Sequence, residues 1–236
     1  MIPEQLTSFA FYQKKKNILL YRARDRSDRT RGYVLKSIIT KDEAVRQAFY
    51  DEYESLHGLS SPHLPAYYAL WEDFRYPDRE GAYLTLCMED CSDRKPLSGM
   101  TPGHKDLLRI ILRTGEILLY LMDRGILYTD LNPSNVLVTG EGKDLEVTLL
   151  DFTFCYYYAR NPYPSYPLRF SYSLDPSLRG HQLLIQELAL LLQEMMEQEE
   201  DSYRSSSLYF LLETGLHPSK SLYLKDYLAL IEKSLI

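Results

Sequence analysis

The hydrophobic pattern of this chain changes from strand-like to helical after its first ninety or so residues. The first part contains four short segments rich in β-branched and aromatic residues, with polar turns between them, which predicts strands. These segments are residues 17–24, 32–39, 64–74 and 81–90. In the second part, residues 104–125 and 185–196 carry broad apolar faces at helical spacing. Antiparallel strands followed by helices predict an α+β fold.

One helix is predicted among the strands. Residues 41–59 have apolar side chains near the 3.6-residue period, Thr40 precedes them as an N-cap, and Gly58 ends the pattern. We therefore expect a small antiparallel β-sheet lobe with one helix at residues 1–91 and a shortened, mostly helical lobe at residues 92–236. Together they would form one domain, with a cleft between the lobes in which a small ligand binds.

Composition excludes several classes of protein. The formal net charge of -6 and the pI near 5.5 argue against nucleic-acid binding through phosphate neutralisation. The three cysteines are too few for a disulfide framework, which favours a reducing, cytoplasmic location. No apolar run reaches the roughly 18 residues of a membrane helix, so we expect no membrane span. The 21 tyrosines are unusual, and we interpret them as amphipathic filler of a shallow core or surface groove.

The strongest chemical signal is the pair of segments GILYTDLNPSNVLV and VTLLDFTF. Asp130 and Asn135 stand five residues apart in a loop, a short strand follows, and Asp151 comes after a second hydrophobic strand. Magnesium prefers carboxylate, amide and phosphate oxygens, so this pattern predicts two ligands and a base around a phosphate-bound Mg²⁺.

These segments resemble the H-R-D-L-x-x-x-N catalytic loop and the D-F-G segment of eukaryotic-type protein kinases. The resemblance implies that Asp130 orients or accepts the proton of the attacking hydroxyl, and that Asn135 and Asp151 hold Mg²⁺ or Mn²⁺ against ATP. GYVLKSI resembles the V-A-I-K strand, so Lys36 would contact the α- and β-phosphates. Glu52 in the predicted helix would pair with Lys36.

The same resemblance places an interlobe linker at residues 88–91. LTLCMEDC is similar to the strand that leads into this linker, so backbone groups near Glu89 and Cys91 would receive the adenine. Cys87 and Cys91 alone do not predict zinc, because no second Cys or His cluster completes a tetrahedral site.

The chain also departs from the family. The stretch before Lys36 contains no glycine-rich loop, and Lys14, Lys15 and Lys16 either replace its backbone donors with side-chain charge or form a solvated hairpin tip. The resemblance covers roughly residues 10–196.

Further departures lie in the motifs themselves. Tyr128 and Thr129 replace His and Arg, so we expect no activation-loop phosphorylation of the usual kind. Asn132 replaces a lysine that contacts the γ-phosphate. Thr153 replaces a glycine and disfavours positive φ, which would restrict movement of this segment.

Two later positions weaken the match. Asp175-Pro176 stands near the place of the family's A-P-E without its glutamate, and Leu184 stands where an aspartate would tie down the catalytic loop.

Several functions remain open. The first is a kinase that transfers the γ-phosphoryl of ATP to a protein Ser, Thr or Tyr hydroxyl. The second is a pseudokinase that regulates a protein partner, using contact surfaces such as the tyrosine-rich segment 154–172. A small-molecule kinase is a third, because DLNPSN also resembles the loop of aminoglycoside and choline kinase-like enzymes, and nucleotidyl transfer is a fourth. A shortened helical lobe would leave apolar surface, which a partner or a second copy in a homo-oligomer would cover.

Overall fold

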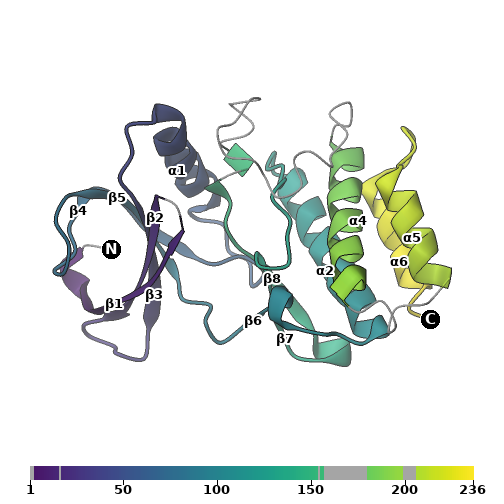
Figure 1. The fold of residues 1–236 in the computed structure, drawn as a ribbon, viewed down its shortest axis with the longest axis horizontal. Coiled ribbons are helices and arrows are strands. Elements are labelled where there is room, and N and C mark those ends of the chain that lie inside the picture. Colours follow the sequence, from purple (N-terminus) through teal and green to yellow (C-terminus); the bar gives the residue numbers. More distant parts are fainter. Residues whose placement is uncertain (1–2, 16, 154, 157–179, 199–205) are drawn as a thin grey trace. The chain divides into compact units, whose positions relative to one another are not determined.

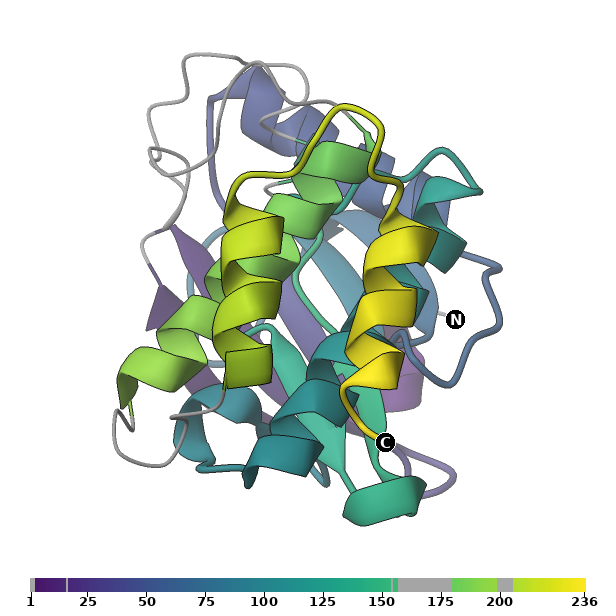
Figure 2. The same ribbon diagram turned by 90° about the vertical axis from the view of Figure 1, so that its right-hand side faces the viewer.

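The computed structural model describes residues 3–15, 17–153, 155–156, 180–198 and 206–236. The described chain falls into two compact units. Residues up to Asp93 belong to the first unit, and residues from Arg94 to Cys155 belong to the second with the helices from His181 onward. Each unit is drawn in Figures 1 and 2 and is described by itself. Residues 157–179, which include Asp175-Pro176 and nearly all of the tyrosine-rich segment, lie outside the described part.

The first unit is a five-stranded antiparallel sheet with one helix (Figure 1). Its strand order is β1-β2-β3-β5-β4. Its elements are the 3₁₀ turn η1 (Pro3–Gln5), β1 (Leu6–Lys15), β2 (Ile18–Asp25), β3 (Gly32–Ile38), α1 (Glu43–Leu56), β4 (Tyr67–Phe74) and β5 (Tyr83–Glu89). The four predicted strands and the helix are confirmed, but β1 was not predicted.

Strand β1 lacks a regular strand signal because its pairing with β2 is irregular. The register shifts twice along the strand, and Ser8 has a φ of 55°. Pairing continues to Lys15 opposite Ile18, so the lysine-rich segment lies at the hairpin end, as one of the two interpretations predicted. Bulges of this kind bend an edge strand and protect it from pairing with other chains.

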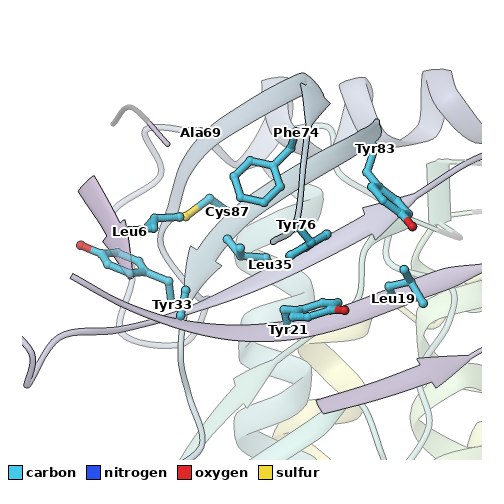
Figure 3. Packing of buried hydrophobic residues seen from close by; sticks show 11 residues of the cluster. Leu6, Leu19, Tyr21, Tyr33, Leu35, Ala69, Phe74, Tyr76, Tyr83 and Cys87 are labelled. Atoms are coloured by element: carbon cyan, nitrogen blue, oxygen red, sulfur yellow. The ribbon is translucent and has the colours of Figure 1, made fainter. Parts of the chain in front are cut away.

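Tyrosines build the core on the sheet face formed by Tyr21, Tyr33 and Leu35 (Figure 3). Tyr76 belongs to the predicted polar turn after β4, but it folds back and stacks on Tyr21 with ring centroids 3.9 Å apart. The hydroxyl of Ser37 lies 2.6 Å from that of Tyr76. Burial raises the pKa of Tyr76 well above its usual value. The interpretation of tyrosine as amphipathic core filler is therefore confirmed for this sheet.

Helix α1 begins two residues later than predicted. Asp42, not Thr40, is the N-cap, because its carboxylate accepts from the backbone N–H groups of Ala44 and Val45. Thr40 instead accepts from the N–H of Asp42 through its hydroxyl. The buried residues of the helix are Val45, Ala48, Phe49, Glu52 and Leu56. The only charged side chain in this set is Glu52.

The second unit combines a small sheet with packed helices. Its strands are β6 (Lys95–Pro96), β7 (Val136–Thr139) and β8 (Glu146–Leu149), and its 3₁₀ turns are η2 (Leu97–Gly99) and η3 (Gly142–Asp144). Its described helices are α2 (His104–Met122), α4 (His181–Gln198), α5 (Ser206–Leu216) and α6 (Leu224–Lys233). Figure 2 shows α5 and α6 beside α4. None of the described helices has the length and apolarity needed to cross a bilayer.

Gly115 allows α2 to approach α4 and α6 closely. A Cβ atom at this position would lie 2.2 Å from Leu228 Cδ2 of α6 and 3.0 Å from Leu188 Cδ1 of α4. Both leucines are buried, so neither can move without disturbing its neighbours.

We predict that Gly115→Ala lowers the free energy of unfolding by about 1–3 kcal/mol, because the methyl group overpacks the junction of three helices. Urea denaturation followed by circular dichroism measures this change. Gly99→Ala is the matched control, since a Cβ there meets nothing within 4 Å. Equal stability of the two variants would show that the helices separate easily at this junction.

Candidate active site

In the first unit, Lys36 and Glu52 form a buried ion pair. Lys36 Nζ lies 3.2 Å from Glu52 Oε2, and the side chains are only 6% and 0% exposed. Strand β3 presents Lys36 on the sheet face opposite the tyrosine core, because neighbours in a strand alternate between faces. Helix α1 presents Glu52 from its buried face, whereas Asp51 bonds to Gln47 and Glu54 is exposed. The structure thus selects Glu52 from the three neighbouring acids.

Tyr67 is a third member of this cluster and was not predicted. Its hydroxyl donates to Glu52 Oε1 at 2.7 Å. The ammonium of Lys36 also lies 5.6 Å from the ring centroid of Phe49, within reach of a cation–π interaction. Sequence gave no signal for Tyr67, because it comes from β4 and is one of many tyrosines in strands.

The predicted adenine linker begins at the end of β5. The backbone N–H of Glu89 donates to Ala66 O at 2.9 Å, and its carboxylate accepts from Ala66 N at 3.1 Å. The Glu89 side chain therefore fastens β5 to the segment before β4. Cys91 is buried, and its Sγ lies 4.0 Å from Glu89 O. Any adenine contact at Glu89 or Cys91 would have to come from the backbone.

In the second unit, the loop around Asp130 is held by its own amide side chains. Asn135 Nδ2 lies 3.1 Å from Asp130 O and 3.3 Å from Asp130 Oδ2. Asn132 Nδ2 donates to the same carbonyl at 3.1 Å, and its Oδ1 accepts from Ser134 N. Asn132 therefore shapes the loop with both ends of its side-chain amide.

Asp151 is held in a strained conformation at the end of β8. Its φ is 61°, in the left-handed region that non-glycine residues rarely adopt. Thr153 does not take a positive φ, the conformation that its β-branched side chain disfavours. The backbone N–H of Leu150 donates to Asn135 O at 2.9 Å, which fixes the residue before Asp151 to the predicted magnesium ligand.

Tyr128 stabilises the segment around Asp151 by a hydrogen bond and a ring contact. Its hydroxyl donates to Leu150 O at 2.6 Å, and its ring meets Phe152 edge-on at 4.8 Å. The side chain is fully buried, and burial raises the pKa of the phenol well above its usual value. A neutral, hydrogen-bonded phenol thus occupies the position of the family's histidine.

The catalytic loop is also tied to α4, but not at the expected position. Leu184 cannot form a hydrogen bond through its side chain. Glu187, one helical turn further, accepts from the backbone N–H of Leu131 at 3.3 Å. Cys155 adds a second tie, because its Sγ lies 3.4 Å from Thr129 N. The signal for Glu187 was an acid within an otherwise apolar helix face.

The residues of the second unit can hold a divalent cation only in part. Among the described residues, no group of three or more His, Cys, Asp and Glu side chains is arranged for a metal. Mg²⁺ bound together with phosphates needs only one or two protein ligands. Asn135 Nδ2 lies near Asp130 Oδ2, and the residue before Asp151 bonds to Asn135 O. The amide oxygen of Asn135 and the carboxylate of Asp151 are of the donor types that Mg²⁺ prefers.

Comparison with known families agrees with this geometry. The model of the protein kinase domain matches residues 19–173, which is more than half of the 236 residues. The chain therefore belongs to the protein kinase family, and its α+β fold, with a β-sheet part followed by a helical part, is that of a kinase-like protein. No curated protein matches the sequence.

We predict that Tyr128→Phe lowers the free energy of unfolding by about 1–3 kcal/mol, because the buried carbonyl of Leu150 loses its hydrogen bond. Chemical denaturation measures the loss. Tyr120→Phe is the control, since Tyr120 is only partly buried in the same unit. Equal effects of the two substitutions would contradict a specific role for the Tyr128 hydroxyl.

The buried ion pair gives a second prediction. Lys36→Met or Glu52→Leu alone should lower the free energy of unfolding by about 3–5 kcal/mol, because each leaves a buried charge without its partner. The double variant should recover more than half of that loss, since both charges are gone. Urea denaturation of the complete double-mutant cycle tests this coupling.

The exposed pair Arg113–Glu116 serves as the control. Its side chains are 46% and 47% exposed, so the same cycle there should give a coupling of about 0–1 kcal/mol. Additive effects at Lys36 and Glu52 would show that the two charges do not depend on each other.

Proposed function

We propose that this protein is an ATP-dependent protein kinase that transfers the γ-phosphoryl group to a protein Ser, Thr or Tyr hydroxyl. The buried pair of Lys36 and Glu52 carries the proposal. Burying two charges costs several kcal/mol per ion, and an apolar pair of similar size is often as stable or more stable. A buried ion pair is therefore better explained by a ligand that needs the lysine than by stability.

Each of the candidate site residues would have a defined task. The ammonium of Lys36, oriented by Glu52 and Tyr67, would neutralise oxygens of the α- and β-phosphates. Asn135 and Asp151 would hold the cation, and Mg²⁺ supplies neutralisation of phosphate charge when it is bound. Backbone groups near Glu89 and Cys91 would receive the adenine.

Asp130 would act on the acceptor. Its carboxylate would orient the attacking hydroxyl and take up its proton as the new oxygen–phosphorus bond forms. The bond between the γ-phosphorus and the β–γ bridging oxygen breaks, and ADP leaves with that electron pair. The strained backbone of Asp151 supports the assignment of a functional site here, because sparsely populated backbone conformations cluster at functional sites.

A nucleotide-binding pseudokinase is the second candidate, and a specific observation favours it. Asn132 uses its amide within the loop, so the side chain that replaces the family's lysine offers no cation to the γ-phosphate. The hairpin of β1 and β2 also contains no glycine, which removes the usual close approach of backbone N–H groups to phosphates. Both features weaken contacts to the transferred group more than contacts to the rest of the nucleotide.

Incubation of the purified protein with γ-labelled ATP and Mg²⁺ or Mn²⁺ distinguishes the candidates. We expect label on the protein itself or on an added protein acceptor. Asp130→Ala should reduce transfer by about 10²–10⁴-fold with nucleotide binding retained, because it removes the base. Asp151→Asn should reduce both transfer and metal-dependent nucleotide binding. Asp123→Asn, an exposed position in the same unit, is the control.

Nucleotide affinity measured by calorimetry on the same samples decides the remaining cases. Metal-dependent binding without transfer would favour the pseudokinase. Label on added choline, aminoglycoside or another small hydroxyl compound, but not on protein, would identify a small-molecule kinase. Absence of both binding and transfer would contradict every nucleotide-dependent function.

A further inference from the structure

Basic side chains are concentrated in one short part of this acidic chain. Residues 11–31 contain eight Lys and Arg against two Asp, which gives this segment a formal charge of +6. Because the whole chain carries a formal charge of -6, the remaining 215 residues together carry -12. A separation of charge on this scale within one chain points to an anionic partner for the basic part.

Four of these basic side chains lie at one end of the sheet in the first unit. They belong to the hairpin that joins β2 to β3 (Figure 1), they are exposed, and we call them the arginine hairpin: Arg24, Arg26, Arg29 and Arg31. Within the part of the chain that the structure describes, none of the four forms an ion pair with a carboxylate. Arg24 Nη1 donates to Thr30 O at 3.3 Å.

The two acids of the arginine hairpin are engaged by the turn itself. Asp25 Oδ1 accepts from the backbone N–H and the hydroxyl of Ser27 at 2.8 and 2.6 Å, and Asp25 Oδ2 accepts from Tyr33 OH at 3.0 Å. Asp28 Oδ1 accepts from the backbone N–H and the hydroxyl of Thr30 at 3.0 and 2.6 Å. These carboxylates therefore fix the shape of the turn through local hydrogen bonds and do not pair with the guanidinium groups.

One arginine of the hairpin is also held against aromatic rings. Arg31 Cζ lies 5.5 Å from the ring centroid of Tyr33 and 5.1 Å from that of Tyr68. A guanidinium stacked in this way has less rotamer freedom to lose when a partner binds. The rigid turn and the stacked side chain thus preorganise part of the surface.

The guanidinium groups of the arginine hairpin retain donors for a ligand. Each carries five N–H donors in a planar fork that matches the two oxygens of a carboxylate. A nucleic acid or an anionic bilayer extends beyond one hairpin, and charges within about 8–10 Å of it are not screened at physiological salt. Such a polyanion would therefore be repelled by the acidic remainder of the chain, whereas a short acidic ligand would contact the hairpin alone.

We propose that the arginine hairpin is a docking surface for a short acidic segment of a protein partner, whose Asp and Glu carboxylates pair with Arg26 and Arg29. The surface lies entirely within the first unit and includes none of the residues assigned to the nucleotide or the metal. The inference therefore goes beyond the proposed kinase function and does not depend on it. Charge complementarity of this kind selects the partner and speeds its association.

Fluorescence anisotropy with the full chain and a labelled peptide of alternating Glu and Ser residues tests the proposal. The same peptide with Gln in place of Glu should bind much more weakly. The double variant Arg26→Gln/Arg29→Gln should weaken binding of the Glu peptide by about 3–30-fold, because two exposed ion pairs are lost. The matched control is Lys143→Gln/Lys225→Gln, which removes the same charge at exposed positions of the second unit and should bind almost like the wild type.

Three results would overturn the proposal. The first is equal affinity for the Glu and Gln peptides. The second is an equal loss of affinity in the two double variants, which would show a general effect of net charge. The third is binding of single-stranded RNA or of phosphatidylserine vesicles, but not of the Glu peptide, at the arginine hairpin.

A charge-conserving variant separates recognition by the planar fork from attraction by charge. Arg26→Lys/Arg29→Lys keeps both charges and loses the bidentate geometry, so its affinity should lie between those of the wild type and the Gln variant. Thermal unfolding of every variant checks that the fold is intact. The assay contains no nucleotide, so its result is independent of whether the protein transfers phosphoryl groups.

Discussion

A carboxylate removed from water must be compensated, and this requirement shapes both units of the protein. In the first unit, Glu52 is fully buried and is compensated by the ammonium of Lys36 and the hydroxyl of Tyr67. In the second unit, Glu187 is equally buried and has one N–H donor. The two buried acids therefore have different partners. Glu52 is paired with an ammonium group, whereas burial and the negative charge of Asp130 raise the pKa of Glu187 to about 8.

Among the described residues of the second unit, Asp151 is the one non-glycine residue with a positive φ. Asp151 has a positive φ, and Thr153 does not, although glycine in the family usually supplies conformational freedom at the later position. The conformation of Asp151 persists because its neighbours on both sides are fixed. The carbonyl of Leu150 accepts from Tyr128, and Phe152 packs against the same tyrosine. The buried Tyr128 side chain thus contacts the residues on both sides of Asp151, whose backbone is strained.

Much of the fold could be predicted from sequence because periodicity is a local signal. Four strands, helix α1 and the long helix α2 follow from residue spacing alone. Strand β1 was missed because its two register shifts break the alternation of side chains. The N-cap was misplaced because Thr40 and Asp42 are both good caps, and only the helix geometry shows which of them meets the first N–H groups.

The candidate site was predictable where its residues belong to a short motif. Asp130, Asn135 and Asp151 lie within one stretch of sequence, and Lys36 on β3 and Glu52 on α1 are only 16 positions apart. Their roles in chemistry remain predictions. The supports of the site were less accessible, since Tyr67 is one of many tyrosines in strands and Glu187 comes from a helix far along the chain. Leu131 and Glu187 are separated by 56 positions, and no local pattern encodes a contact of that length.

The loop around Asp130 is held by hydrogen bonds within the chain. It lacks the family's arginine, which binds a phosphorylated activation loop. Asn132 and Asn135 bond to the carbonyl of Asp130, Glu187 holds Leu131, and Cys155 contacts the N–H of Thr129. Each contact joins two parts of the second unit and needs no phosphorylation to form. A loop held in this way gains little from a phosphorylated partner, because its donors and acceptors are already engaged. The replacement of the family's arginine by Thr129 is therefore compatible with an ordered loop.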